Sequence, residues 1–409
     1  MSLKKTKIVN ILDSITVFSI YIVAFQLPIA KAAIEIFSTL AIVCFIIRKI
    51  LQREGLERSV INLPIFAYLA ICFLSIFISN NLGISTRTFF GKILQDVMFL
   101  FIVAETLNTE ERLKIFIYIF ISSSLLLGID GIYQFFTHKD FIRNRPYFGI
   151  PRIHATFSSA NDYGCYLAAL LPFSVAVFFE ALRRKIKSKY FFIVVFILLF
   201  ICLMLTVSRG AWFAFLGSIL LMSIWVKAIW IIMAVIGIVL LVLNQSFFPY
   251  LRERLSNFFV FSDQSSGDRR MMWEAAFKMF LSKPWLGVGI GTFMFNFKNF
   301  VSKDYPFTTP YAHNCYLQIA SEIGIIGLLA FLLILGAFFY KNIKTLNLRS
   351  NNYSWYILLA TTASVLGYCV QMVVDTIFYS LDLGILFWLL LGLGIAASRL
   401  TIGKTKNIN

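Results

Sequence analysis

Apolar runs alternate with short polar segments along the whole chain. The runs are close to twenty residues long, the length at which an α-helix crosses the hydrocarbon core of a bilayer. The pattern predicts about twelve membrane-spanning helices, at residues 14–30, 32–49, 62–79, 88–106, 113–136, 161–181, 190–207, 210–226, 228–247, 313–340, 353–376 and 380–398. The first run is followed by further runs and not by a small-residue cleavage site, so we expect it to be retained rather than removed as a signal peptide. The expected fold is an all-α polytopic membrane protein, a single integral membrane domain over residues 1–409.

The basic residues predict the orientation of this domain. Lys and Arg in short loops stay in the cytoplasm, and 21 of the 37 basic residues fall in the terminal segments and loops that a cytoplasmic N-terminus would place on that side. We therefore expect a multi-pass membrane protein with both termini in the cytoplasm. The net charge of +17 is explained by this bias and by attraction to the anionic headgroups of membrane lipids, so no nucleic-acid partner is expected.

Composition and cysteine spacing exclude other classes. With 59% hydrophobic and 14% charged residues, the chain is not a soluble globular domain. Its six cysteines lie in or beside apolar runs without CxxC spacing, which predicts buried thiols rather than a disulfide or zinc framework.

Two segments on the expected outer face are too long to be simple connectors. They are residues 137–160 and the long loop 248–312. Within the second, apolar residues recur at helical spacing and predict an amphipathic helix over about 268–282, starting near Asp268 and ended by Lys283-Pro284. The apolar residues of this expected helix are Trp273, Ala276, Phe277 and Phe280.

His313 is the first candidate for chemistry. It is one of three histidines, and it stands in Tyr311-Ala312-His313-Asn314, where a long polar segment returns to an apolar run. Imidazole is the side chain best suited to moving a proton near neutral pH. The alternative is a histidine in contact with lipid headgroups. Asp375, at the outer end of the span 353–376, is expected either to orient the His313 ring, to pair with an arginine, or to be a structural partner.

Three arginines on the same face are candidates for binding phosphate. Arg209 separates two apolar runs at the outer end of a predicted helical hairpin, where an ionisable side chain indicates a functional site. The alternative is that its side chain reaches the headgroup phosphates of membrane lipids. Arg269 and Arg270 lie in the first turn of the expected loop helix, and a helix N-terminus with arginines suits phosphate oxygens. The alternative for this pair is a solvated basic patch.

Other polar segments and residues are weaker candidates for a catalytic or binding role. The segment Pro284-Trp285-Leu286-Gly287-Val288-Gly289-Ile290-Gly291 follows a helix and not a strand, so we expect a tight turn packed against other backbone rather than a nucleotide loop. Lys92 and Asp96 are ionisable groups inside the span 88–106. The outer loops contain no DxD pair and no His/Cys cluster with metal-ligand spacing. We therefore expect neither a metal nor a cofactor.

Taken together, several short motifs resemble those of the O-antigen ligase and O-antigen polymerase superfamily, over about residues 150–340. They are Ser208-Arg209-Gly210, Gly267-Asp268-Arg269 four residues before Trp273, Pro284 with Gly287-Val288-Gly289-Ile290-Gly291-Thr292-Phe293, and His313-Asn314 with Glu322-Ile323-Gly324. The stretch from Arg152 to Asn161 is also similar to an Arg/Gly/Phe/Asn stretch of the family, although His154 or Ala155 stands where a glycine is common.

The resemblance implies a metal-independent, inverting transfer of a glycan from undecaprenyl pyrophosphate to an acceptor hydroxyl on the periplasmic face of the bacterial inner membrane. The long loop 248–312 would then be periplasmic. His313 matches the general base of the family, and Arg209 and Arg269 match its two pyrophosphate-binding arginines, with Arg270 as the neighbouring candidate. The residues expected to support them are Asn314, Asp375, Arg152 and Asn161.

Four functions are compatible, to different degrees, with these motifs and candidate residues. An O-antigen ligase, which uses lipid A-core as acceptor, is preferred over a polymerase, which uses a lipid-linked repeat unit. A protein O-glycosyltransferase usually carries a further soluble C-terminal domain, whereas this chain ends about ten residues after its last predicted span. A transporter or flippase is disfavoured because the charges gather at the outer ends of the spans and no internal repeat is evident.

Overall fold

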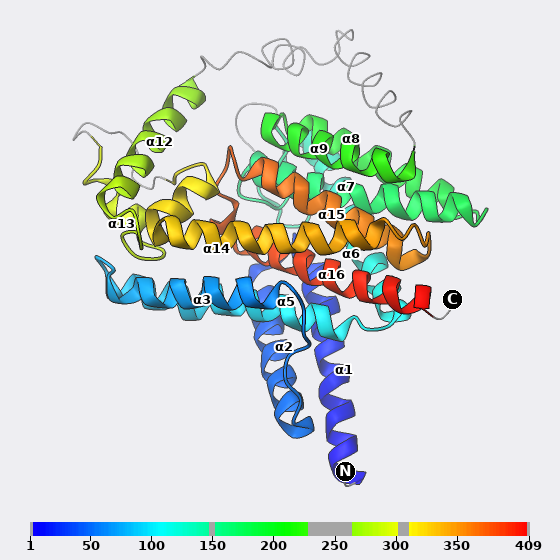
Figure 1. Cartoon of the computed structure of the whole chain (residues 1–409). Helices are drawn as coiled ribbons and strands as arrows, with labels where there is room; N and C mark the ends of the chain where they lie inside the picture. The colour runs from blue at the N-terminus through cyan, green and yellow to red at the C-terminus, as the bar shows by residue number, and fades with distance from the viewer. Residues whose placement is uncertain (1–2, 147–151, 228–263, 302–310, 407–409) are drawn as a thin grey trace.

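The computed structural model describes residues 3–146, 152–227, 264–301 and 311–406, which form helices joined by turns (Figure 1). No β-strand occurs within these ranges, so the all-α prediction is confirmed there. The elements are α1 (Leu3–Gln26), α2 (Lys31–Gln52), α3 (Asn62–Phe77), α4 (Leu82–Thr88), the π-helical turn η1 (Phe89–Ile93), α5 (Leu94–Thr106), α6 (Glu110–Thr137), α7 (Ala160–Arg183), α8 (Lys189–Leu205), α9 (Arg209–Val226), α12 (Gln264–Ser282), α13 (Phe293–Phe297), α14 (Cys315–Leu346), α15 (Tyr353–Gln371), the 3-10 turn η2 (Ile377–Tyr379) and α16 (Leu381–Lys406).

The helices follow the predicted apolar runs, but the count of twelve spans is not confirmed. Every predicted span coincides with helical segments except 228–247, which lies outside the described residues. In the described part of the chain, seven helices are long and apolar enough to cross a membrane: α1, α6, α7, α9, α14, α15 and α16. Two further apolar helices, α3 and α8, are shorter. The predicted loop 248–312 is described only over residues 264–301 and 311–312.

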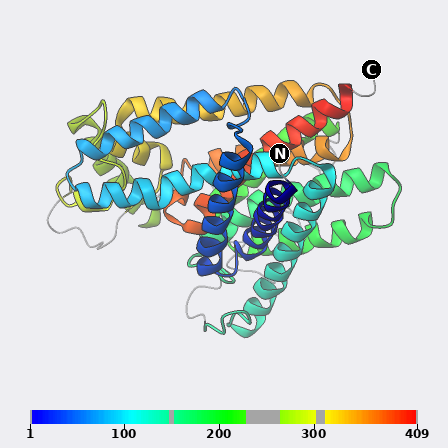
Figure 2. The same cartoon turned by 90° about the horizontal axis from the view of Figure 1, so that it is seen from below.

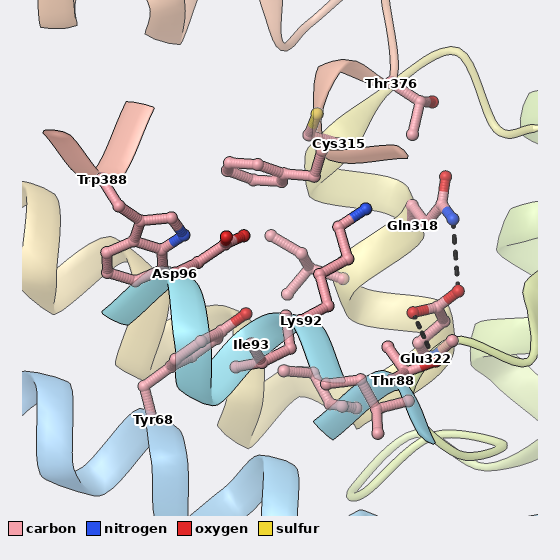
Figure 3. Close-up of a pocket in the computed structure, with 15 residues that line it drawn as sticks. Tyr68, Thr88, Lys92, Ile93, Asp96, Cys315, Gln318, Glu322, Thr376 and Trp388 are labelled. Carbon is pink, nitrogen blue, oxygen red and sulfur yellow. Dashed lines mark hydrogen bonds between the residues drawn. The ribbon is translucent and has the colours of Figure 1, made fainter. Parts of the chain in front are cut away.

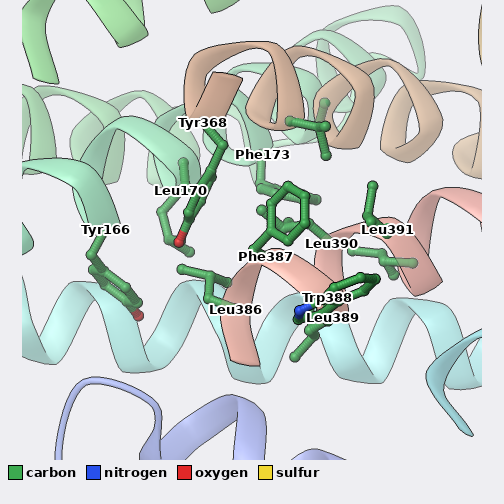
Figure 4. Close-up of a cluster of buried hydrophobic side chains, with 14 of the residues drawn as sticks. Tyr166, Leu170, Phe173, Tyr368, Leu386, Phe387, Trp388, Leu389, Leu390 and Leu391 are labelled. Carbon is green, nitrogen blue, oxygen red and sulfur yellow. The ribbon is translucent and has the colours of Figure 1, made fainter. Parts of the chain in front are cut away.

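The core of the bundle lies where α7, α15 and α16 meet. Figure 4 shows Tyr166 and Phe173 of α7, Tyr368 of α15 and Phe387 of α16 packed together, each at most 2% exposed. α16 is apolar on all sides, as expected for a helix enclosed by others. All six cysteines are free thiols; five are buried and Cys369 is half-buried, as predicted.

Basic residues assigned to the cytoplasm gather around carboxylates. Arg48 and Arg112 both form ion pairs with Asp13, and Arg399 pairs with Glu57. These contacts bring the ends of α2, α6 and α16 together, which agrees with their expected position on one side of the membrane. The α1–α2 hairpin projects from this bundle at a steep angle to α3, α14 and α16 (Figure 1; Figure 2). Which side faces the cytoplasm stays a prediction.

The predicted amphipathic helix is α12, and its buried face matches the prediction only in part. It begins at Gln264, four residues before Asp268, and ends at Ser282, directly before Lys283-Pro284. Phe277, assigned to the apolar face, is 50% exposed. Ala276 is buried as predicted, and Trp273 and Phe280 are half-buried. The buried face also carries Met272, Ala275 and Met279, small or flexible side chains that allow close approach to α13 and to the start of α14 (Figure 1).

The glycine-rich turn after α12 packs against a break in α14. Gly324 adopts φ +70° and interrupts the helix, which frees backbone groups on both sides. The turn pairs with them: Val288 N–H donates to the Ser321 carbonyl at 3.0 Å, and Ile325 N–H donates to the Pro284 carbonyl at 2.8 Å. The expected role as a tight turn against other backbone is confirmed.

Replacing Gly287 by alanine is therefore expected to destabilise the fold by about 2–4 kcal/mol. Gly287 has φ +69°, and a Cβ there would lie 2.3 Å from the carbonyl carbon of Glu322, so both backbone strain and overlap oppose a side chain. The midpoint of thermal unfolding in detergent measures the effect. The matched control is Gly336→Ala in α14, where a Cβ meets nothing within 4 Å. Equal midpoints for the two variants would contradict this account.

Candidate active site

His313 stands at the entrance to α14 in a constrained conformation. Its φ of +46° lies in the left-handed region, which histidine occupies more readily than most residues with a Cβ. The next residue, Asn314, is the N-cap of α14, and its side-chain oxygen accepts from Leu317 N–H at 2.9 Å. Asn314 thus supports the site by starting the helix that holds His313.

Asp375 holds the imidazole ring of His313. The two side chains meet at 3.1 Å between His313 Nδ1 and Asp375 Oδ1. An ionised carboxylate only accepts hydrogen bonds, so Nδ1 carries the proton in this contact and Nε2 is left to accept one. Of the predicted roles for Asp375, orientation of the ring is the one that the geometry supports. The predicted span 353–376 is too long, because α15 ends at Gln371 and Asp375 lies in the turn beyond it.

Charge around Asp375 favours its ionised form. Burial of the carboxyl group raises its pKa, but the hydrogen bond and charge of His313 and the charge of Arg269 outweigh this effect and hold the pKa of Asp375 below its ordinary value. The carboxylate therefore stays ionised as the pH falls to its ordinary pKa of 3.8, and the pairing with His313 is lost only below it.

α12 contributes one arginine to the site and turns the other away. The charge of Arg269 acts on Asp375, whereas Arg270 is exposed. The helix is fixed to the site by Trp273, whose indole N–H donates to the His313 carbonyl at 3.4 Å. The sequence assigned Trp273 only to an apolar face; the signal that could have suggested more is that a partly buried indole N–H usually finds an acceptor.

Arg209 opens α9 next to the segment that carries Asp375. The residue two positions before it, Val207, has φ +52°, a rare conformation for a β-branched side chain and one that marks a tightly determined turn. A Cβ at Gly210 would lie 2.7 Å from Gln371 Oε1 and 2.8 Å from Val374 Cγ2, so α9 begins in direct contact with the residues just before Asp375. The Arg209 side chain is half-buried there.

This arrangement can perform acid–base chemistry beside an anion. An oriented imidazole can take a proton from a hydroxyl, and guanidinium groups can stabilise negative charge that develops on a leaving group. In the described ranges, no group of three or more His, Cys, Asp and Glu side chains is placed to hold a metal ion.

Comparison with known proteins finds a family match that includes these residues. Residues 193–332 match the family model described as O-antigen ligase, and this segment includes Arg209, Arg269 and His313. The resemblance to the O-antigen ligase superfamily is therefore confirmed. With its apolar helices, it indicates a bacterial membrane protein.

Two relatives cover more of the chain. A Rickettsia typhi protein named "Putative polysaccharide ligase" is 25% identical over an alignment of 312 residues that covers 71% of this chain and 71% of the relative. A Rickettsia prowazekii protein with the same description is 26% identical over an alignment of 261 residues that covers 58% of this chain and 60% of the relative.

The stretch from Arg152 to Asn161 lies before the matched O-antigen ligase segment and contacts it. Arg152 donates from Nε to the Thr206 carbonyl at 2.9 Å and from Nη2 to Asn161 Oδ1 at 2.8 Å. Both predicted supporting residues thus brace the turn that precedes Arg209. Ala155, with φ +48°, occupies the left-handed conformation that glycine favours, so position 155 and not 154 is where the family's glycine fits.

Proposed function

We propose that this protein is an O-antigen ligase-like glycosyltransferase. It moves a glycan from undecaprenyl pyrophosphate to a hydroxyl of lipid A-core on the periplasmic face of the inner membrane. The observation that carries the proposal is the His313–Asp375 pair, held beside Arg269 at the end of the bundle where α9 also begins. The names of the two relatives favour a ligase over a polymerase.

The proposed reaction is a direct displacement at the anomeric carbon. His313 Nε2 accepts the proton of the acceptor hydroxyl while its oxygen forms a bond to the anomeric carbon. The bond from that carbon to the pyrophosphate oxygen breaks, and undecaprenyl pyrophosphate leaves with one additional negative charge. Arg209 and Arg269 stabilise this charge, so no metal is required in the proposal. Attack opposite the leaving group inverts the anomeric configuration.

Asp375 is a positioning residue in this scheme. Its hydrogen bond keeps the proton on Nδ1 and stabilises the imidazolium that forms when Nε2 takes the acceptor proton. Three further residues support the site indirectly. Arg152 and Asn161 hold the turn before Arg209, and Asn314 caps the start of α14.

The choice of acceptor is the test of this function. Purified protein with a lipid-linked glycan donor, in the presence of EDTA, is expected to attach the glycan to lipid A-core and to form no product when that acceptor is omitted. Gel shift and mass spectrometry of the product measure the transfer, and NMR of the new linkage reports inversion. Polymer growth without lipid A-core would instead indicate a polymerase, and loss of activity in EDTA would contradict the metal-free mechanism.

A further inference from the structure

A group of basic side chains gathers at the turn between α1 and α2. Lys31 opens α2, and its Nζ lies 3.7 Å from Asp382 Oδ1 at the start of α16. Arg143, in the segment 138–146 that follows α6, donates from Nη2 to the Ile29 carbonyl at 2.6 Å. Two segments more than a hundred residues apart in the chain therefore bring cations to the same turn.

Asp140 folds the segment 138–146 so that a second arginine lies close to the first. Its carboxylate accepts from the backbone N–H of Arg143 at 2.5 Å and from that of Arg145 at 3.1 Å. Burial lowers the pKa of Arg143, and the charge of Arg145 lowers it further, so the two guanidinium groups are near enough to repel each other. Neither forms an ion pair with a carboxylate among the described residues. We call Lys31, Arg143 and Arg145 the Lys31 site.

The positive charges of the Lys31 site reach the surface, whereas the nearby carboxylates are buried. The side chain of Lys31 is 50% exposed, Arg145 is exposed and Arg143 is half-buried. Glu35, one turn further along α2, is exposed but makes no ion pair with Lys31 in the part of the chain that the structure describes. An anion that approaches from outside therefore meets the cations first. The buried carboxylates, at most 7% exposed, are Asp130, Asp140 and Asp382.

The turn between α15 and α16 joins the Lys31 site to the candidate catalytic pair. Asp375, which holds His313, and Asp382, which pairs with Lys31, are seven positions apart in the chain. Even a fully extended chain of this length spans at most about 25 Å. The charges of both carboxylates also act on Asp162 at the start of α7, so all three lie near one another. A glycolipid acceptor with several sugar rings can therefore contact both places.

Lys92, the other lysine near this turn, is surrounded by carboxylates. It extends from the π-helical turn η1 into a cavity that Asp96 and Glu322 also line (Figure 3). The charges of Asp96, Glu322 and Asp382 all act on it. A phosphate in this cavity would meet these carboxylates as well, so the cations of the Lys31 site are better placed to bind one.

The position of the Lys31 site suits the acceptor better than the donor. α9 and α12, which carry Arg209 and Arg269, lie above the layer of α14 and α16 in Figure 1, and the α1–α2 hairpin lies below it. The view from below, in Figure 2, shows the hairpin in front. In an inverting displacement the acceptor approaches opposite the leaving group. The proposed pyrophosphate site and the Lys31 site stand in the same relation.

We propose that the Lys31 site binds a phosphate group of the acceptor lipid. The inference rests on the proposed glycan transfer and adds a recognition site for its acceptor. Lipid A is a phosphorylated glycolipid, and a phosphate monoester brings about two negative charges and three acceptor oxygens to side chains that offer only donors. Binding there holds the acceptor so that its hydroxyl reaches His313. Membrane phospholipids carry similar headgroups, and the experiments separate the two sources.

Acceptor kinetics of a paired variant test the site. Lys31→Gln with Arg145→Gln removes two exposed charges and leaves the contact of Arg143 with the Ile29 carbonyl in place. It is expected to raise KM for lipid A-core about tenfold, as the loss of charge-assisted hydrogen bonds would, and to leave the donor KM within twofold of the wild type. Lipid A-core treated with phosphatase is expected to show the same rise with the wild type and no further rise with the variant.

The matched control removes the same two residue types from other exposed positions. Lys278→Gln with Arg87→Gln changes the net charge equally, in α12 and α4. Both KM values are expected to stay within twofold of the wild type. If the variant of the Lys31 site also leaves the acceptor KM within twofold, the site is overturned while the glycosyltransferase function stands.

Bilayers of defined composition separate the acceptor phosphate from membrane headgroups. The acceptor KM is measured in nanodiscs of phosphatidylcholine and of phosphatidylglycerol, and the tenfold difference between wild type and variant is expected in both. A difference that appears only in phosphatidylglycerol and persists with dephosphorylated acceptor would assign the site to membrane phospholipid and overturn the proposal.

A binding measurement decides the matter if no transfer is found. Surface plasmon resonance of the protein in phosphatidylcholine nanodiscs compares lipid A-core with its dephosphorylated form. The wild type is expected to bind the phosphorylated form about tenfold more tightly, and the Lys31→Gln, Arg145→Gln variant to bind both forms equally. In a protein without transfer activity, the absence of this preference in the wild type overturns the site.

Discussion

Replacing His313 by alanine is expected to lower the rate of glycan transfer by about 10²–10⁴-fold, the usual contribution of a positioned general base. The alanine cannot accept the proton of the acceptor hydroxyl, so the attacking oxygen stays protonated and weakly nucleophilic. The Trp273 contact is made to the His313 carbonyl and does not depend on the imidazole, so α12 should keep its place. Initial rates with a lipid-linked glycan donor and lipid A-core measure the loss.

Two further variants separate lost chemistry from lost structure. His313→Asn also lacks a base, but asparagine tolerates the left-handed φ of +46°, so it should be as inactive as alanine while unfolding at the wild-type temperature. His138→Asn is the histidine control, because His138 is exposed and also left-handed at φ +56°, and it should transfer at the wild-type rate. Full activity in both His313 variants would contradict the proposal that His313 is the general base.

The sequence predicted where the helices lie better than it predicted which face of a helix is buried. Apolar length alone places the helices of the described ranges, because backbone groups in a bilayer must be paired within a helix. The buried face of α12 could not be predicted in the same way. Its periodicity favoured Ala276, which is buried, and Phe277, which is exposed; the neighbouring α13 and α14 instead select Ala275 and Met279 beside Ala276. Large apolar residues are then left exposed.

The members of the site were also easier to predict than their contacts. His313 and Arg209 stand out as polar residues at the ends of apolar runs, and Arg269 stands out in the first turn of the expected loop helix. Which of them meet is decided by tertiary structure: Asp375 is 62 residues from His313 in the chain and reaches it only because α15 ends early, at Gln371. Arg269 and Arg270 are neighbours with the same charge, and only the resemblance to the family favoured Arg269. The rotation of α12 now distinguishes them, because it leaves Arg270 exposed and Arg269 half-buried.

The difference between Arg269 and Arg270 leads to the second prediction with a large expected effect. Arg269→Gln is expected to reduce kcat/KM for the lipid-linked donor by about 10²–10³-fold, as removal of a preorganised group that stabilises leaving-group charge does elsewhere. The charge of Arg269 lowers the pKa of Asp375, so Arg269 lies within electrostatic reach of the His313–Asp375 pair. In the proposed mechanism this arginine stabilises the pyrophosphate that leaves when an acceptor held at His313 attacks. Arg269→Lys keeps the charge but not the forked geometry, so an intermediate loss is expected. Steady-state rates at varied donor concentration measure each variant.

Arg270 provides the matched control for this prediction. It is the next residue on the same helix with the same charge, but it is exposed. If local positive charge near the membrane were sufficient, Arg270→Gln would reduce donor use as strongly as Arg269→Gln. If the position of the guanidinium relative to Asp375 decides, Arg270→Gln should stay within about threefold of the wild type, a change of less than 1 kcal/mol. Equal losses in the two variants would therefore contradict the assignment of Arg269 and favour a general electrostatic attraction of the anionic donor.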